Sequence, residues 1–539
     1  MIMPQLSLEG LKNKNEWSGS GIKVPDYDLR IIAENTAAAP VWVHFGAGNI
    51  FRGFIARLQN TLLNEGLSDK GIIAAETFDY EIIDKIYRPF DNLTLMTDLY
   101  TDGNTQYEVI ASITDSVKVD SDPANRAKMN DIISSPSMQM LSFTVTEKGY
   151  KITDGDGNYL PVVKRDIEAG PEAPAHVMSI VASLLYTRFK AGRLPLAIVS
   201  MDNCSQNGAK LKESVVAIAD EWLRKGFVDA AFIDYINDDK TISFPWSMID
   251  KITPRPDMSV YKNISAMGFE NMGPVTTSVG TFIAPFVNAE VPEYLVIEDN
   301  FPNGRPPLEK AGVYMTDRRT VNLSERMKVT ACLNPLHTCL AVFGCLLGFT
   351  KISDEMEDKD LNRLVHKLGY DEFIKVVDDP KILSPEKFIE EVLEVRLPNR
   401  FLPDTPQRIV TDTSLKMPIR FGETIKSYNE SPDLSLDDLT LIPLTIAGWL
   451  RYLSGKDDNW NDMELSSDPQ MGELQKALEG IKLGDISSVG SKLVPVLSRA
   501  DIFGMDLSKT PLYGKIEQFY AEMIKCKGAV RELINKYTD

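Results

Sequence analysis

The chain is poor in the side chains that build metal sites and disulfide frameworks. It has only four histidines and five cysteines among 539 residues. No two cysteines form a CxxC pair, and their spacing fits neither a zinc site nor a set of disulfides. We therefore expect no bound metal, and we expect a protein of the reducing cytoplasm.

The sequence also lacks an excess of basic charge and any long hydrophobic run. Lysine and arginine total 58 against 77 aspartates and glutamates, which gives a net charge of −19. This balance argues against nucleic acid or an anionic membrane as the main partner, but it permits a local basic pocket for a small anion. The amino terminus has no signal-peptide pattern, and the longest near-apolar run, Cys339–Phe349, is too short to span a bilayer.

What is present is the composition of an ordinary globular protein, with 43% apolar and 25% charged residues. The length predicts more than one domain. After about forty polar residues, which we expect to form an irregular lead-in, a strand over 39–45, a helix over 53–66 and a strand over 71–76 make a βαβ unit. Helical periodicity dominates from about residue 324. We predict an α/β domain over 1–295 and a mostly helical domain over 296–539.

The turn between the first predicted strand and helix is rich in glycine. Gly46 and Gly48 would let the backbone approach a pyrophosphate at a helix amino terminus, although Phe51 takes the third glycine position. Glu76 and Asp79 lie at the end of the next strand, where an acid accepts hydrogen bonds from an adenosine ribose and favours NAD over NADP. An ordinary strand-to-helix turn and solvated loop acids are the structural alternatives.

Two further strands are predicted over 140–146 and 196–201, and polar residues follow each of them. In open α/β sheets, ligands bind at this carboxyl edge of the strands. The segment after the second of these strands includes Asn203.

A second group of candidates lies in the helical half. An alcohol dehydrogenase needs a base for the hydroxyl proton and donors for the developing alkoxide. Lys328 could be that base, while Asn334 and His337, three residues apart, share one helix face. The structural alternatives are a solvated lysine and a helix cap formed by Asn334 and the following proline. Arg408 and Lys416 could hold a carboxylate or a hydroxyl-rich substrate, with surface ion pairs as the alternative.

Several segments, in this order, resemble the polyol-specific long-chain dehydrogenases, the family of mannitol dehydrogenase and fructuronate reductase. They are 44–53, 146–150, 200–203, 247–254 and 297–309. The resemblance extends from about residue 40 to beyond 420. It implies a Rossmann-type NAD-binding domain followed by a mostly helical domain, a secondary-alcohol dehydrogenase or reductase activity, and no metal.

The resemblance also implies roles for single residues. Lys328 matches the general base, Asn203 and Asn334 match the amides that stabilise the alkoxide, His337 matches the histidine that orients the substrate, and Glu325 matches an acid that gates proton release. The matched substrate-pocket positions are Asp250, Arg408 and Lys416. The expected cofactor-binding positions are Phe45, Gly46, Gly48, Asn49, Ile50, Glu76, Asp79 and Asp250.

The sequence departs from the family pattern near the lysine. Lys328 and Asn334 are six positions apart where the family commonly has five, and Pro335 follows where a small residue is usual. Phe51 replaces a usual histidine. Proline removes a helical hydrogen bond, so we predict that a bulge or kink absorbs the extra residue.

The expected reaction is the NAD-dependent interconversion of D-fructuronate and D-mannonate. A mannitol 2-dehydrogenase-type polyol dehydrogenase and a tagaturonate reductase are alternatives, and a sugar-phosphate substrate comes third. Two different classes also stay open: a catalytically silent NAD- or sugar-binding protein, and a redox-neutral isomerase or epimerase that uses bound NAD. The sequence fixes neither the oligomeric state nor the physiological direction.

Overall fold

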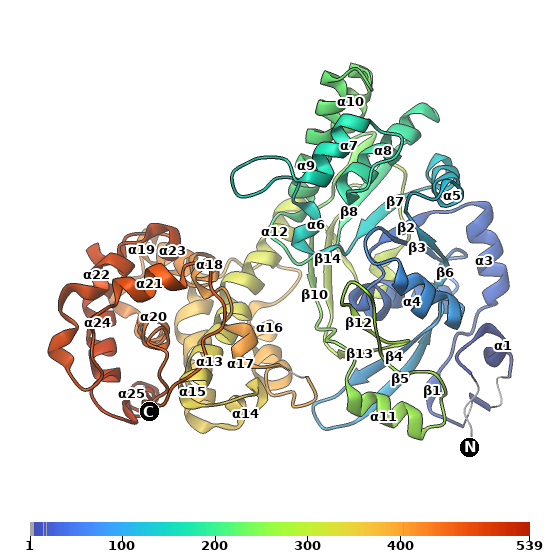
Figure 1. Cartoon of the computed structure of the whole chain (residues 1–539). Coiled ribbons are helices and arrows are strands. Elements are labelled where there is room, and N and C mark those ends of the chain that lie inside the picture. Colours follow the sequence, from blue (N-terminus) through green and yellow to red (C-terminus); the bar gives the residue numbers. More distant parts are fainter. Residues whose placement is uncertain (1–4, 14–15, 18, 403) are drawn as a thin grey trace. The chain divides into compact units, whose positions relative to one another are not determined.

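The chain folds into two compact units, which are described separately. The computed structural model (Figure 1) describes residues 5–13, 16–17, 19–402 and 404–539. The units are Met1–Asn322 and Leu323–Asp539. The division falls later than the predicted 295/296, because β14 (Tyr294–Glu298) and β15 (Tyr314–Thr316) pair in one sheet with β10 (Ser247–Asp250) of the first domain.

The first domain contains a six-stranded parallel sheet in the order β6-β3-β2-β7-β8-β9. This is the strand order of a Rossmann fold, so the predicted fold class is confirmed. The strands predicted over 39–45, 71–76, 140–146 and 196–201 are all present. The bounds are β2 Trp42–Phe45, β3 Ile72–Glu76, β6 Ile113–Lys118, β7 Met140–Phe143, β8 Leu196–Ser200 and β9 Ile242–Ser243.

Both faces of this sheet are buried. Successive side chains of a strand point to opposite faces, so the residues of one strand pack in two different clusters. Val43 and Phe45 of β2 pack in one hydrophobic cluster, and Trp42 packs in another. A parallel sheet covered on both sides reads as a continuous apolar run, as these strands do. The helices of this domain are α1 Leu8–Leu11, α3 Leu29–Ala38, α4 Ala56–Asn64, α5 Pro123–Ser134, α6 Thr146–Tyr150, α7 Pro161–Ala169, α8 Val177–Lys190, α9 Asn207–Arg224, α10 Ala230–Asn237 and α11 Met258–Ala266.

The expectation of an irregular lead-in is wrong for most of the described residues before 40. Asp28 caps α3 by accepting hydrogen bonds from the backbone N–H groups of Arg30 and Ile31. The strand β1 (Ile22–Lys23) joins a second sheet in the order β1-β5-β4-β13. The other strands of this sheet are β4 Thr94–Leu99, β5 Thr105–Ile110 and β13 Phe286–Glu290, and a separate two-stranded sheet pairs β11 Val275–Thr276 with β12 Phe282–Ile283.

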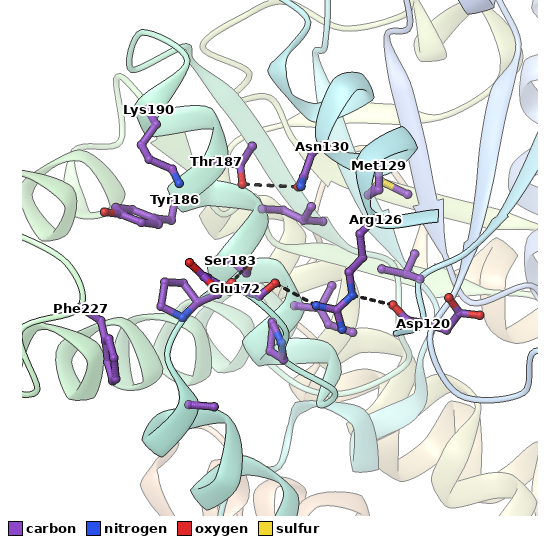
Figure 2. A pocket seen from close by; sticks show the side chains of 16 residues that line it. Asp120, Arg126, Met129, Asn130, Glu172, Ser183, Tyr186, Thr187, Lys190 and Phe227 are labelled. Atoms are coloured by element: carbon purple, nitrogen blue, oxygen red, sulfur yellow. Dashed lines mark hydrogen bonds between the residues drawn. The ribbon is translucent and has the colours of Figure 1, made fainter. Parts of the chain in front are cut away.

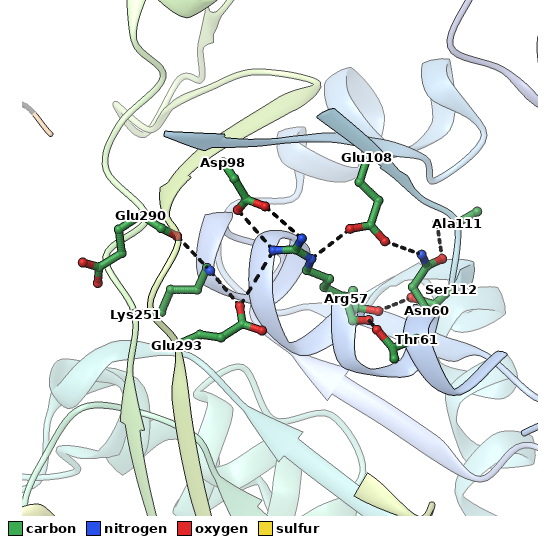
Figure 3. Close-up of polar contacts among 11 residues, drawn as sticks. Arg57, Asn60, Thr61, Asp98, Glu108, Ala111, Ser112, Lys251, Glu290 and Glu293 are labelled. Carbon is green, nitrogen blue, oxygen red and sulfur yellow. Dashed lines mark hydrogen bonds and ion pairs between the residues drawn. The ribbon is translucent and has the colours of Figure 1, made fainter. Parts of the chain in front are cut away.

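A charged cluster links α4 to the second sheet (Figure 3). Arg57 forms two hydrogen bonds with Asp98, of 2.8 and 3.1 Å, and one of 2.9 Å with Glu108. Glu293 lies 3.9 Å away and also pairs with Lys251 at 2.7 Å. Burial lowers the pKa of Arg57, but the three carboxylates outweigh it and raise the pKa overall. The guanidinium therefore stays charged and holds three acids.

The second domain is helical and contains several π-helical turns. The π-helices are η5 Met327–Cys332, η6 Leu368–Phe373, η8 Val392–Arg396 and η9 Pro418–Gly422. The α-helices, after α12 (Arg318–Arg326), are α13 Asn334–Leu347, α14 Ile352–Glu357, α15 Lys359–Lys367, α16 Pro385–Glu391, α17 Pro406–Ile409, α18 Thr413–Met417, α19 Glu423–Glu430, α20 Leu441–Tyr452, α21 Met471–Ala477, α22 Val494–Leu497, α23 Ala500–Phe503, α24 Leu512–Met523 and α25 Ala529–Thr538.

One helical run in the described chain, Arg318–Leu347, is long and apolar enough to cross a membrane by composition alone. However, 78% of its most apolar window is buried inside the protein. The core helix of a globular domain has this same combination of apolar composition and burial.

Candidate active site

The glycine turn after β2 has the backbone geometry of a phosphate-binding loop. Gly46 has φ +101°, in the region that favours glycine, and a Cβ atom there would collide with the carbonyl oxygen of Thr144. A Cβ at Gly48 would have nothing within 4 Å, so the turn is open at that point. Helical backbone begins at Asn49. A dinucleotide pyrophosphate fits at such a glycine turn, next to a helix amino terminus.

A chain of buried hydrogen bonds supports this turn from beneath. Trp42 Nε1 donates to Ser142 Oγ (2.7 Å), whose hydroxyl then donates to His44 Nδ1 (2.6 Å). His44 Nε2 then donates to Thr144 Oγ1 (2.8 Å), and Thr144 donates to the Gly46 carbonyl (3.4 Å). Burial lowers the pKa of His44 well below its ordinary value, which is consistent with this neutral tautomer.

Two of the remaining side chains near the turn, those of Phe45 and Asn49, are engaged by the protein itself. Phe45 stacks on Phe143 in the core, with ring centroids 5.0 Å apart, so only its backbone is available to a ligand. Asn49 donates to the Pro254 carbonyl (3.0 Å) and accepts from Arg52 (2.8 Å). Ile50 is partly exposed.

Two residues close to the turn explain the missing third glycine. Gly53 allows the close packing of helix on sheet that the third glycine of the motif usually allows. A Cβ atom at Gly53 would lie only 2.6 Å from the side chain of Val287 in β13. Phe51 stacks on His44 with ring centroids 4.0 Å apart and nearly parallel planes.

The two acids at the end of β3 and in the turn that follows it, Glu76 and Asp79, are buried. One carboxylate oxygen of Glu76 accepts from the Ala47 N–H (2.9 Å), and the other accepts from the N–H groups of residues 77–79. Glu76 thus links the glycine turn to the turn after β3. Asp79 Oδ2 accepts from the Thr277 hydroxyl (2.7 Å), and its buried Oδ1 has no hydrogen-bond partner among the described residues.

The predicted catalytic residues divide between the two domains. Asn203 is exposed, three residues after the end of β8, and Asp250 ends β10 with 6% exposure. Lys328, Asn334 and His337 lie in the second domain.

The predicted distortion between Lys328 and Asn334 is present. Lys328 lies in the π-helix η5, and the Leu333 N–H donates to the Lys328 carbonyl, five residues back, at 3.1 Å. A π-turn contains one residue more than an α-turn, so it absorbs the extra position. The side chains of Lys328 and Glu325, one turn earlier, are 1% and 8% exposed. Leu333 leaves helical geometry (φ −127°, ψ −64°), and α13 begins at Asn334.

His337 and its charged neighbours form the polar centre of the second domain. His337 Nε2 lies 3.1 Å from Asp404 Oδ2, although the contact is not aligned as a hydrogen bond. Arg408 donates from Nε and Nη2 to the other oxygen of Asp404, at 3.0 and 2.7 Å. Burial lowers the pKa of His337 even though Asp404 opposes this shift. The imidazole is therefore neutral at pH 7 and can exchange a hydrogen bond with a substrate oxygen.

Two more cations lie close to this centre. Lys416 Nζ donates to the carbonyls of Ile409 (3.0 Å) and Thr411. Burial, followed by the positive charge of Arg420, lowers the pKa of Lys416 to about 8. The sequence did not single out Arg420, whose Nη1 donates to Thr338 Oγ1 at 2.5 Å. Its one sequence signal is position, one helical turn after Lys416.

A buried carboxyl group lies behind α13. Glu355 of α14 is 0% exposed and lies against Gly344, and neither of its oxygens has a hydrogen-bond partner among the described residues. Burial, followed by the charge of Asp404, raises the pKa of Glu355 well above its ordinary value. Burial thus favours the protonated form of this carboxyl group.

We expect Glu355→Gln to change how stability depends on pH. Because the folded-state pKa is raised, the folded protein keeps a proton that the unfolded chain releases above about pH 4.5, so this residue makes stability fall as pH rises. Glutamine does not ionise, and the variant should gain roughly 1–3 kcal/mol relative to wild type between pH 5 and 8. Urea denaturation across this range measures the gain.

The matched control is Glu357→Gln on the exposed face of the same helix, for which we expect no such gain. A difference between Glu355→Gln and wild type that stays constant with pH would mean that Glu355 is ionised in the folded protein.

A separate hollow of about 570 Å³ lies in the first domain, lined in part by α5 and α8. Figure 2 shows Arg126 at its side, where Arg126 donates to the backbone carbonyls of Asp120 (2.9 Å) and Glu172 (2.8 Å). None of the predicted site residues lines this hollow. Among the described residues, no group of three or more His, Cys, Asp or Glu side chains could hold a metal ion.

Comparison with protein families gives two matches that together cover most of the chain. The model of the mannitol dehydrogenase Rossmann domain matches residues 41–310, and that of the mannitol dehydrogenase C-terminal domain matches residues 321–524. The boundary between the two matches agrees with the division seen in the structure.

Known proteins resemble the chain over nearly its whole length. A D-mannonate oxidoreductase of Thermotoga maritima is 50% identical over 534 residues, 99% of this chain and 98% of that protein. A substrate-free D-sorbitol dehydrogenase structure has a TM-score of 0.77 at 25% identity and covers 95% of this chain and 97% of its own. A Pseudomonas fluorescens mannitol 2-dehydrogenase, solved with NAD and D-mannitol, has a TM-score of 0.70 at 24% identity, with coverage of 96% and 97%.

Proposed function

Because this chain belongs to the mannitol dehydrogenase family, we propose that it is an NAD-dependent oxidoreductase that interconverts D-fructuronate and D-mannonate. The observation that carries the proposal is the 50% identity, over almost the full length of both chains, to a D-mannonate oxidoreductase. The cations Arg408, Lys416 and Arg420 around His337 support an acidic substrate. The five cysteines, none in a disulfide, support a cytoplasmic location.

The glycine turn supports a dinucleotide cofactor. Gly46 lets the backbone approach a pyrophosphate, and the hydrogen-bond chain from Trp42 fixes the Gly46 carbonyl. NADH, when bound, supplies the hydride. The acids Glu76, at the end of β3, and Asp79, in the turn that follows, favour NAD over NADP, because they would repel a 2′-phosphate.

The residues of this chain manage the proton and the substrate oxygen. In the reducing direction, the ketone carbon accepts a hydride and its oxygen becomes an alkoxide, to which Lys328 donates a proton. The amides of Asn203 and Asn334 stabilise this oxygen, and His337, oriented by Asp404, positions it. Glu325 gates the return of a proton from solvent to Lys328. Asp250 holds a substrate hydroxyl at the cofactor.

The alternatives differ in substrate or in chemistry. A mannitol-type dehydrogenase would prefer fructose, and a tagaturonate reductase would accept the other hexuronate. A silent binding protein or a redox-neutral isomerase would bind NADH without consuming it. The burial of Lys328, together with Asn334 and His337 one turn apart in α13, favours a working reductase over the last two.

A substrate panel distinguishes these possibilities. NADH oxidation at 340 nm is followed with D-fructuronate, D-tagaturonate, D-fructose and fructose 6-phosphate as oxidants, each also with NADPH. We expect the highest kcat/KM with D-fructuronate and NADH. A higher kcat/KM for fructose would favour the polyol reaction, and NADH binding without turnover of any substrate would favour a silent or redox-neutral protein.

A further inference from the structure

Three cations lie near His337, and two of them are already engaged. Arg408 is bound through two nitrogens to Asp404, and its side chain is 64% exposed. The ammonium of Lys416 is directed at the backbone carbonyls of Ile409 and Thr411. These two positions are the ones that the sequence suggests for holding a substrate carboxylate.

Arg420 differs from both in how its guanidinium is held. It lies in η9, which packs on η5 and on α13. Its Nη1 donates to Thr338 Oγ1 at 2.5 Å and to the Asn334 carbonyl at 3.4 Å. Among the described residues, no acceptor pairs with Nη2 or Nε, and no carboxylate forms an ion pair with this side chain.

This arrangement leaves free the edge of the guanidinium that binds carboxylates. A carboxylate pairs with arginine through two parallel hydrogen bonds, and the Nε–Nη2 edge offers two such donors in one plane. Burial lowers the pKa of Arg420 to about 10, so the group is still charged at neutral pH. A partly buried cation without an anionic partner is costly unless a ligand supplies the anion.

The anchor of Arg420 also places it beside the predicted reaction centre. Nη1 contacts the backbone of Asn334 and the side chain of Thr338, and these two residues are one helical turn apart on the same face of α13. The positive charge of Arg420 is close enough to His337 to lower the pKa of its imidazole. The guanidinium of Arg420 thus lies at the end of α13 that carries the predicted substrate-binding residues.

We propose that Arg420 binds the carboxylate of a hexuronate substrate and sets the preference of this enzyme for sugar acids over neutral ketoses. The inference rests on the proposed function, because only an acidic substrate offers the carboxylate. Arg408 has the lesser role of holding Asp404, and through it His337.

The test compares Arg420→Gln, Arg420→Lys and Arg408→Gln with wild type in the full-length protein. For Arg420→Gln we expect kcat/KM with D-fructuronate to fall about 100-fold, mainly through KM, because a doubly hydrogen-bonded charged contact is lost. The Kd for NADH should stay within threefold, and kcat/KM with D-fructose should fall at least tenfold less than kcat/KM with D-fructuronate. Arg420→Lys should recover part of the loss, and Arg408→Gln, the matched neutralisation, should lose less than Arg420→Gln.

Chemical rescue separates binding from a structural role. Guanidinium chloride at millimolar concentration should raise the fructuronate activity of Arg420→Ala at least fivefold and leave its fructose activity unchanged. The inference is overturned if Arg420→Gln keeps the fructuronate KM of wild type within threefold. Equal losses for fructuronate and fructose, without rescue, would also overturn it and show that Arg420 only anchors α13.

The wild-type measurement decides the proposed function separately. If wild type reduces neither fructuronate nor tagaturonate, the proposed function fails, and this inference fails with it. If wild type reduces a hexuronate but the variants keep its selectivity, the inference alone fails.

Discussion

Lys328→Met is expected to lower kcat for D-fructuronate reduction by about 10²–10⁴-fold, the range typical of losing a positioned general acid. The side chain is 1% exposed, so solvent cannot easily replace its proton. Methionine keeps the apolar stem, and the π-helix η5 should persist because its hydrogen bonds are made by the backbone. Rates at 340 nm and NADH titration by fluorescence measure the two expected effects, a slow reaction and an unchanged Kd for NADH.

Lys351→Met is the control for the loss of a lysine in the same domain, because this side chain is exposed at the start of α14. It should keep the wild-type rate. If Lys328→Met retained more than a tenth of wild-type kcat, another group would have to deliver the proton, and the π-turn would have no catalytic purpose.

Arg57→Met is expected to destabilise the protein by about 3–5 kcal/mol, the range for breaking a buried ion pair on one side only. Its side chain is 19% exposed, and its removal leaves Asp98, Glu108 and Glu293 without their shared cation. Without the guanidinium the three acids repel one another, and α4 loses its ionic contact with the second sheet (Figure 3). The free energy of unfolding from urea denaturation measures the loss.

A second variant shows whether repulsion is the cause. Adding Asp98→Asn and Glu108→Gln to Arg57→Met should restore a large part of the stability, since the uncompensated charges are gone. Arg30→Met is the control, because it removes an ion pair on the surface. The side chains of Arg30 and Glu34 are 76% and 62% exposed, and the variant should change the free energy of unfolding by less than about 1 kcal/mol. If the triple variant were less stable than Arg57→Met, repulsion would not be the cause. The other contacts of Asp98 and Glu108 would then stabilise the protein.

The sequence predicted the first domain well because its signals are local. The strands β2, β3, β7 and β8 are buried on both faces and read as apolar runs. The domain boundary lies further along the chain than predicted, because β14 and β15 pair with β10. Such long-range pairing has no local sequence signal. The helix α3 in the lead-in was missed because only two of its side chains, Ile32 and Thr36, are buried.

The candidate site was predicted in part, and the remainder depends on tertiary contacts. The six-residue spacing from Lys328 to Asn334 indicated a distortion, and a π-turn is present there. The sequence suggested Glu76 as a ribose acceptor, but its carboxylate already accepts four backbone N–H groups. Glu355 has no sequence signature, and Arg420 has only its position one helical turn after Lys416, because what distinguishes each is a partner it lacks among the described residues.

The most direct test of the proposed reaction follows the hydride. The wild-type protein is incubated with D-fructuronate and NADH that carries deuterium at the transferred position, and the product is identified by NMR and mass spectrometry. The proposed reaction predicts D-mannonate with one deuterium, on the carbon that was the ketone, formed in equal amount to the NADH consumed. Unlabelled mannonate, or deuterium transfer to fructose but not to fructuronate, would contradict it.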